Sequence, residues 1–378
     1  MKTIILAFLV CLLYSCNQQT SLNQKKNLDT NSNTVSVFET PSNENPENLK
    51  HIKQNLVAPP DLPEYEQSVT GDPVVVEVKL VVQEKKLEIA PGVKIWALTF
   101  NGTVPGPMIV VHQNDYVQIT LVNPSANTLT HNIDFHAATG GLGGGKLSTV
   151  NPGQEATFMF KAIKSGVFVY HCAPGGMMVP LHVTSGMNGA IMVLPRDGLK
   201  DENGNSLHYD KAFYIAEQDY YVPRDSTGKF KEYNTPAESF GDIIKVFQTL
   251  TPTHIIFNGT TGSLTGKNAI MVNVGDKVLF ITSQANRDTR IHLIGGHADL
   301  VWLGGSFNDK PATNYESWPV VGGSAVAMIY QFRQPGTYLY LNHNLIEAFA
   351  FGAMAEINVE GKWDDNLMKE ISKPEKIK

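Results

Sequence analysis

The stretch Val169-Tyr170-His171-Cys172-Ala173-Pro174 places an imidazole and a thiol side by side at the end of a strand pattern. It follows the turn Ser165-Gly166, and bulky and β-branched residues alternate from Phe168 to His171. Successive side chains on a strand point to opposite faces, so His171 and Cys172 should serve different surfaces. We therefore expect Cys172 in the interior of a sandwich and His171 on an outer face.

An inner metal site is predicted around the thiol. A thiolate, two imidazoles and a thioether form the donor set of copper electron-transfer sites. The chain offers this set as His131, Cys172, His182 and Met187. Met177 and Met178, which lie between the cysteine and His182, are alternative sources of the thioether.

The same parity predicts an outer metal site. His136 follows His131 by five residues, and Asp134 shares a face with His136 if this segment is extended. His136 and His171 would then hold a second metal with Asp134 nearby. Electrons could pass between the two sites along the backbone that joins Cys172 to His171.

The surrounding sequence predicts an all-β protein. From about residue 72 it consists of short alternating apolar runs, punctuated by Gly, Pro and Asn, which is typical of antiparallel β-sandwiches. The expected strands in the first half are residues 74–82, 94–100, 116–123, 155–161 and 167–171.

The second half of the chain repeats the first. Phe100-Asn101-Gly102-Thr103 recurs as Phe257-Asn258-Gly259-Thr260, and residues 166–170 correspond to residues 336–340. Two homologous sandwiches in tandem explain this repeat. Leu341-Asn342 stands where the first half has the histidine and the cysteine, so a second thiolate copper site is excluded.

The N-terminal region has the pattern of an exported protein. Lys2 and the apolar run from Ile4 to Leu13 predict a signal peptide, and Leu13-Tyr14-Ser15-Cys16 is similar to a bacterial lipobox. An ordinary secretory signal is the alternative. Cys16 would carry lipid and tether the protein at the periplasmic or outer-membrane face of a bacterium. Of the three cysteines, this leaves Cys172 without a disulfide partner in the mature chain.

The predicted domain organisation follows from these patterns. Residues 1–16 are the signal peptide, 17–65 a flexible tether, 66–198 the first sandwich, 199–361 the second and 362–378 a C-terminal tail. The net charge is −6 and charged residues make up 17% of the chain, which argues against nucleic-acid binding.

Several motifs carry a family resemblance. They include residues 131–140, Tyr170-His171-Cys172-Ala173-Pro174, residues 185–189, residues 283–288, residues 292–297 and Asn342-His343-Asn344-Leu345-Ile346-Glu347. From about residue 72 to 360 the chain resembles copper-containing dissimilatory nitrite reductases. The resemblance implies Greek-key cupredoxin sandwiches and a homotrimer that reduces nitrite to nitric oxide. Each subunit would hold one type 1 copper inside the first sandwich and share type 2 copper with a neighbour.

The resemblance also implies roles for further residues. His343 of the partner subunit would complete the type 2 copper site formed by His136 and His171. Asp134 and His292 match the family's two proton-handling groups. Ile294 matches the apolar cap over nitrite, and Ser317 stands where a threonine supporting the second histidine is expected.

The chain departs from the family at two positions. Nine residues separate Cys172 from His182, one more than is common, so this loop should bulge. Leu181 stands where an exposed aromatic residue is common, which affects docking of the electron donor. The chain has no Cys-X-X-Cys-His motif, so the donor should be a separate small protein, a c-type cytochrome or a cupredoxin.

Two other functions fit part of the pattern. A multicopper oxidase shares cupredoxin repeats, but it requires paired His-X-His motifs, which this sequence does not contain. A lipid-anchored electron carrier would need only the inner copper. Asp134 and His292 argue against a carrier, because such a protein has no use for proton-handling groups at an open metal site.

Overall fold

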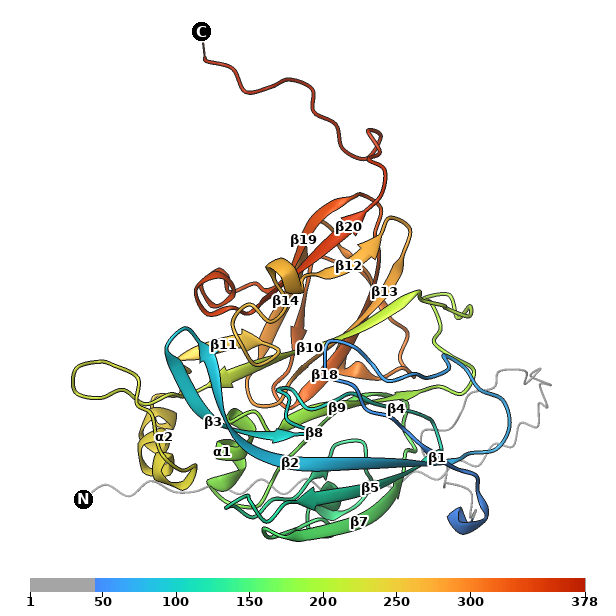
Figure 1. Ribbon diagram of the computed structural model, residues 1–378. Coiled ribbons are helices and arrows are strands. Elements are labelled where there is room, and N and C mark those ends of the chain that lie inside the picture. Colours follow the sequence, from blue (N-terminus) through green and yellow to red (C-terminus); the bar gives the residue numbers. More distant parts are fainter. Residues whose placement is uncertain (1–44, 378) are drawn as a thin grey trace, which may run out of the picture. The chain divides into compact units, whose positions relative to one another are not determined.

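The computed structural model describes residues 45–377, and these residues form two β-sandwiches in tandem (Figure 1). The predicted signal peptide, Cys16 and the first part of the tether lie outside the described residues. The all-β prediction is confirmed, and so is the tandem arrangement.

The first sandwich contains the predicted strands. Its strands are β1 (His51–Lys53), β2 (Val75–Ala90), β3 (Val93–Phe100), β4 (Ile109–His112), β5 (Tyr116–Asn123), β6 (Asp134–Phe135), β7 (Gln154–Lys161), β8 (Gly166–His171) and β9 (Asn188–Leu194). One sheet has the order β1-β2-β5-β7 with β3 paired to β2, and the other has the order β4-β9-β8-β6.

The second sandwich has the same plan with added strands. Its strands are β10 (Lys211–Tyr220), β11 (His254–Phe257), β12 (Ile270–Asn273), β13 (Lys277–Gln284), β14 (Thr289–Ile294), β15 (Ala298–Trp302), β16 (Ala312–Tyr315), β17 (Ser317–Val320), β18 (Ser324–Gln331), β19 (Gly336–Asn342) and β20 (Met354–Glu360). One sheet has the order β11-β10-β13-β18-β15-β16, and the other has the order β12-β20-β19-β14-β17.

Strand pairing shows the internal repeat directly. β2 runs parallel to β5 as β10 does to β13, and β4 runs parallel to β9 as β12 does to β20. The central antiparallel pairs also correspond, β8 with β9 and β19 with β20. β6 pairs with β8, and β14 with β19, at equivalent positions.

Alternation along the strands builds the core of each sandwich. On β5, Val117, Ile119 and Leu121 are fully buried while the residues between them are partly exposed. Burying an aliphatic side chain of this size contributes about 1.5–3 kcal/mol. Cys172 and Met187 belong to the same apolar cluster as these three residues.

A separate apolar cluster joins the two sandwiches. Val167 and Val169 of β8 pack in one cluster with Leu279 of β13 and Ala327 of β18. The alternate residue on β8, Tyr170, belongs to the core of the first sandwich. His171 has the parity of the two valines, so it lies on the face of β8 that is turned away from that core.

The predicted tether, residues 17–65, overlaps a segment that is already part of the folded structure. Residues 46–48 form a short 3₁₀ helix, and β1 then pairs in parallel with β2. The Gln54 amide exchanges hydrogen bonds with the backbone of Val110, and the Tyr65 hydroxyl lies 2.9 Å from that of Tyr209. This segment therefore bonds to several parts of the folded chain, and residues 45–65 are not free.

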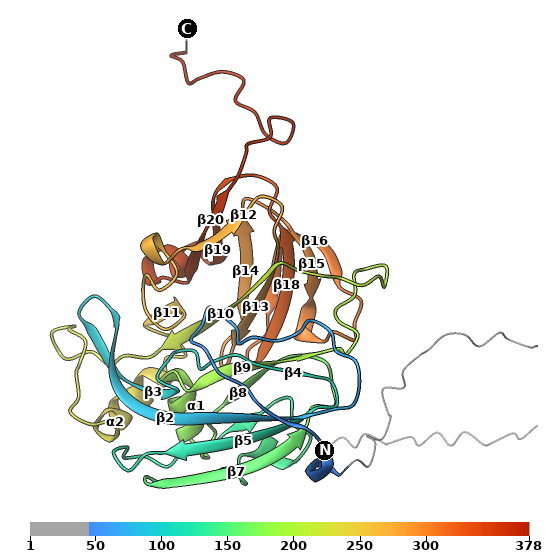
Figure 2. The ribbon, with the colours of Figure 1, turned by 45° about the vertical axis from the view of Figure 1, so that its right-hand side comes forward.

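Helices are few and short in the part of the chain that the structure describes. The α-helices are α1 (Met178–Thr184) and α2 (Phe240–Phe247), with further short 3₁₀ segments and a π-helical turn at Glu347–Phe351. None of these helices is long and apolar enough to cross a membrane. After β20, residues 361–377 leave the sheets and extend outward in both views (Figures 1 and 2).

Candidate metal centres

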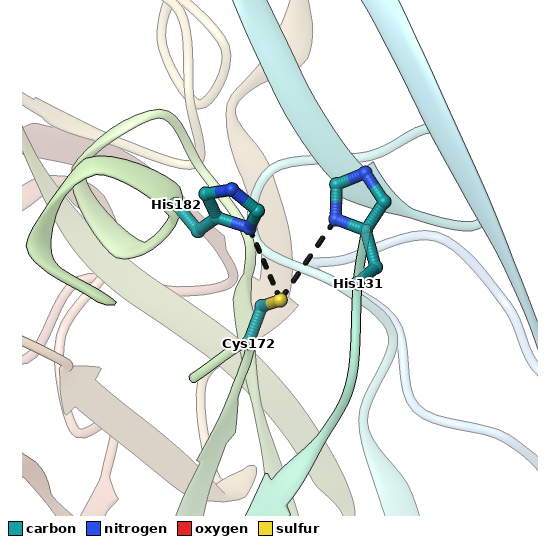
Figure 3. A group of neighbouring side chains, drawn as sticks. All are labelled: His131, Cys172 and His182. Carbon is teal, nitrogen blue, oxygen red and sulfur yellow. Dashed lines mark hydrogen bonds between the residues drawn. The ribbon is translucent and has the colours of Figure 1, made fainter. Parts of the chain in front are cut away.

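The inner site brings together three predicted ligands inside the first sandwich. Cys172 Sγ lies 3.8 Å from His131 Nδ1 and 3.2 Å from His182 Nδ1 (Figure 3). Cys172 directly follows β8, His182 lies on α1, and His131 is held by a β-bridge to Val150. All three side chains are fully buried, which suits a site kept from water.

Burial shifts the pKa values of Cys172 and His182. It raises the pKa of the Cys172 thiol to about 12, although hydrogen bonds from the backbone of Asn132 and Ala173 act in the opposite direction. Burial and the nearby His131 lower the pKa of His182 to about 3. His182 is therefore a neutral imidazole at physiological pH. Two converging Nδ1 atoms and a sulfur atom in a dry interior match the preference of copper for soft and imidazole donors.

Met187 has the burial expected of the fourth ligand. It is fully buried in the same apolar cluster as Cys172, and its backbone oxygen accepts a hydrogen bond from Cys172 N at 3.1 Å. Met177 is 52% exposed and Met178 is half-buried. The burial of these three methionines favours Met187 over the alternatives, and its role as a ligand stays a prediction.

The long loop between Cys172 and His182 is accommodated by glycine and a short helix. Gly175 and Gly176 have φ values of +119° and +53°, and α1 begins two residues later. Glycine adopts such conformations without strain, so the chain reverses before the helix turns His182 inward. Leu181 is only 2% exposed and offers no apolar contact to a docking protein.

The outer site forms at the end of β8. Asp134 pairs directly with His171 in the β6–β8 ladder, and His136 follows Asp134 by two residues. The Nε2 atoms of His136 and His171 are 3.1 Å apart, and donor atoms of all three residues lie within 4.8 Å of one another. This confirms the expected common face of Asp134 and His136, and places His171 on it.

The outer ligands are directed away from the inner site but remain linked to it. Burial, reinforced by His136, lowers the pKa of His171, so its imidazole is neutral and able to bind a metal. His171 Nδ1 lies 3.2 Å from the carbonyl oxygen of Cys172 and donates to it, which leaves Nε2 directed toward His136. The inner and outer groups are thus joined by the peptide bond between His171 and Cys172.

His292 and His343 form a separate pair on the second sandwich. Their ring centroids are 5.0 Å apart, with the planes nearly perpendicular. His292 Nδ1 donates to the carbonyl oxygen of Glu316 at 2.6 Å, whereas Ser317 Oγ lies at 3.5 Å. The Glu316 carbonyl therefore holds the imidazole more firmly than the hydroxyl predicted from the sequence. No side-chain pattern signals a backbone contact of this kind.

The two histidine pairs are not combined within one chain. Among the described residues, donor atoms converge within 4.8 Å in two groups of three, His131 with Cys172 and His182, and Asp134 with His136 and His171. Neither group includes His292 or His343. Ile294, predicted as the substrate cap, is 39% exposed on the same strand as His292.

Two residues that the sequence patterns do not single out contact the predicted site residues: Glu84 contacts His131, and Gly143 contacts Asp134. Burial acts to raise the pKa of Glu84, but hydrogen bonds from His131 and from the turn at Thr128 outweigh it and lower the pKa to about 2. Gly143 has a φ of +51° and packs directly against the carboxylate of Asp134. Both contacts join residues that are distant in the sequence or lie in a glycine run, so local patterns do not reveal them.

Comparison with known proteins identifies the family. Two family models described as "Multicopper oxidase" match residues 81–198 and 211–363, one for each sandwich. The chain is 57% identical over 327 residues to a copper-containing nitrite reductase of Neorhizobium galegae, covering 86% of each chain. This chain belongs to the copper-containing nitrite reductase family.

Other members give the same result. The copper-containing nitrite reductase of Alcaligenes faecalis is also 57% identical, over 86% of this chain and 87% of its own. The structure of copper nitrite reductase from Nitrosomonas europaea matches 77% of this chain and 95% of that one, with a TM-score of 0.61 and 25% identity. The protein is accordingly a copper-dependent oxidoreductase, and its membership of the nitrite reductase family favours nitrite reduction over the carrier and multicopper-oxidase alternatives.

Replacing Gly143 should disturb the outer site through Asp134. In Gly143→Ala the new Cβ would overlap with the Asp134 carboxylate and would lie 2.8 Å from the Phe135 carbonyl oxygen. We expect turnover to fall by roughly tenfold to a hundredfold, because small displacements of a reacting group are costly. Steady-state kinetics and copper analysis measure the effect.

Gly141→Ala is the matched control. It lies in the same glycine run, but no atom comes within 4 Å of its added Cβ. If both variants turn over at the same rate as the unaltered protein, Gly143 does not position Asp134.

Proposed function

We propose that this protein reduces nitrite by one electron to nitric oxide and water. The inner site of His131, Cys172, His182 and Met187 would hold type 1 copper. The observation that carries this proposal is the geometry of two consecutive residues: Cys172 is buried with His131 and His182, whereas His171 lies with His136 and Asp134. Family membership supplies nitrite as the substrate.

The inner and outer sites would have different roles in the reaction. One-electron transfer is the chemistry that bound copper would supply, from a donor protein at the inner site to nitrite at the outer site. Complete burial of His131, Cys172 and His182 keeps water from the inner site. The outer site needs access for a small anion, and His136 is exposed there.

Asp134 and His292 would handle the two protons that the reaction consumes. Asp134 lies beside both outer histidines, within reach of a bound anion. The Glu316 carbonyl fixes the Nδ1 proton of His292, so its Nε2 is free to face the substrate. Positioned acids and bases of this type are the groups that general acid–base catalysis requires.

We propose that type 2 copper is shared between subunits of a homotrimer. His136 and His171 of one chain would bind it together with His343 of the partner subunit. Two observations support this: His343 lies outside the donor group of its own chain, and exposed apolar residues surround its loop. Leu345, Ile346 and Phe349 are 47%, 71% and 59% exposed, as expected of an interface between chains.

The remaining partners and the location are also proposals. A small electron donor, a c-type cytochrome or a cupredoxin, would dock near α1. Two exposed apolar side chains support this surface: Met177 just before α1, and Leu250, which is 85% exposed, after α2. A lipid on Cys16 would hold the protein at the periplasmic or outer-membrane face of a bacterium. This last proposal rests on the sequence alone, because Cys16 lies outside the described residues.

The function can be tested by removing one ligand from each site. Cys172→Ala should abolish visible thiolate-to-copper absorption and donor-driven nitric oxide release while type 2 copper stays bound. His343→Ala should have the opposite effect on the metals, with the absorption kept and type 2 copper lost. Metal analysis, visible spectra and nitrite-dependent nitric oxide release are the measurements. Loss of both metals together in either variant would contradict the assignment to two sites.

Asp134→Asn should separate chemistry from metal binding. The amide keeps the size of the side chain but cannot transfer a proton. We expect both metals to remain and turnover to fall by on the order of 10²–10⁴, the usual contribution of a general acid. A variant with unchanged turnover would exclude Asp134 from the reaction.

Mixing two inactive chains tests the shared site. His171→Ala and His343→Ala each destroy every site in a pure trimer. Random co-assembly in equal amounts should restore about a quarter of the sites, because each mixed ring of three contains one junction with both histidines intact. Activity of the co-expressed protein is compared with that of each variant alone. No recovery in trimers shown to be mixed would mean that each site lies within one chain.

A further inference from the structure

A buried carboxylate contacts the inner site from the far side of His131. Glu84 lies on β2, and its side chain is only 3% exposed. Its Oε1 atom is 3.1 Å from His131 Nε2, while His131 Nδ1 faces Cys172 Sγ. One imidazole therefore connects the carboxylate to the predicted copper position.

The carboxylate is held rigidly by other donors. Glu84 Oε1 also accepts from Leu129 N at 2.8 Å, and Oε2 accepts from the backbone and hydroxyl of Thr128 at 2.9 and 2.7 Å. The turn that leads to His131 thus donates three hydrogen bonds to this side chain. Since the carboxylate acts only as an acceptor here, His131 Nε2 carries the proton, and the lone pair of Nδ1 is free for a metal.

We propose that Glu84 is a positioning residue of the inner copper site, which fixes the tautomer and orientation of His131 and lowers the reduction potential of the bound metal. The inference rests on the proposed function, since it requires copper at His131, Cys172 and His182. Carboxylates that accept from the outer nitrogen of a ligating histidine orient the ring and strengthen it as a ligand.

The effect on the potential follows from electrostatics. A fixed negative charge stabilises the more positive, oxidised metal, and burial limits screening of that charge by solvent. The second imidazole shows the contrast, because His182 Nε2 is buried with no hydrogen-bond partner in the described part of the chain. The charge of Glu84 therefore acts through His131 and has no counterpart at His182.

Glu84→Gln removes the charge and keeps an acceptor for His131, while its amide nitrogen replaces the oxygen that accepts from Thr128. The amide oxygen can still accept from His131, so we expect the copper content and the visible spectrum to stay close to those of the unaltered protein. The equilibrium for reduction should shift about tenfold toward the reduced metal, which is a rise of about 59 mV for one electron. A potentiometric titration followed by visible absorption measures this.

Glu88→Gln is the matched control. Glu88 lies on the same strand, four residues on, but it is exposed, and its carboxylate accepts from Gly92 N in the turn. The substitution Glu88→Gln removes the same formal charge and should leave the reduction potential of the inner copper unchanged. Equal potentials in Glu84→Gln and Glu88→Gln would overturn the electrostatic part of the proposal.

Glu84→Leu and Glu84→Asp test the positioning part. The leucine removes every acceptor, so His131 loses its fixed tautomer, and we expect an altered electron paramagnetic resonance spectrum or loss of type 1 copper with type 2 copper kept. The aspartate keeps the charge but not the reach, so its potential should stay below that of Glu84→Gln. Unaltered spectra in Glu84→Leu would overturn the positioning role. Absence of thiolate-to-copper absorption in the unaltered protein would instead refute the proposed function itself.

Discussion

The two-residue period of β8 is the constraint on which the rest of the site depends. Because alternate side chains leave the strand on opposite faces, one peptide bond separates a fully buried thiol from an imidazole on the outer face. The valines of β8 fix this orientation by packing against the second sandwich, while Tyr170 packs into the core of the first. A shift of register by one residue would exchange the two environments and destroy both donor groups.

The second sandwich shows that the fold alone does not create a metal site. Asn342, the last residue of β19, stands at the position equivalent to Cys172; it pairs with Ile291 and donates to the buried Glu217 at 2.8 Å. Burial raises the pKa of Glu217 to about 7, and Thr289 supplies a further hydrogen bond. The second sandwich thus has a hydrogen bond to a buried carboxylate at the position where the first has the thiol. The pairing of His292 with Leu341 matches that of Asp134 with His171, so one register position supplies both proposed proton-handling groups.

The sequence predicted the features that depend on local order along the chain. Strand parity placed Cys172, His171 and Asp134 correctly, because a period of two needs no knowledge of distant contacts. It could not reveal Glu84, which meets His131 from 47 residues away, or the glycine that packs against Asp134. The predicted tether reaches residue 65 for a related reason. A polar segment has no apolar pattern, yet β1 joins the sheet through backbone hydrogen bonds that any sequence can make.

The proposed division of the outer site between chains would make metal binding depend on assembly. Within one chain, His136 and His171 provide two imidazoles, which is fewer than the three protein ligands usual at catalytic metal centres that keep an open position. The pair of His292 and His343 cannot bind as a complete site either, since no third donor joins them among the described residues. In the proposed site one surface therefore carries two of the three ligands and the other carries one, and each carries one proton-handling group. Assembly of the chains would then create both the metal affinity and the proton supply of the outer site. An unassembled subunit could accept an electron at its inner site but could not pass it to nitrite.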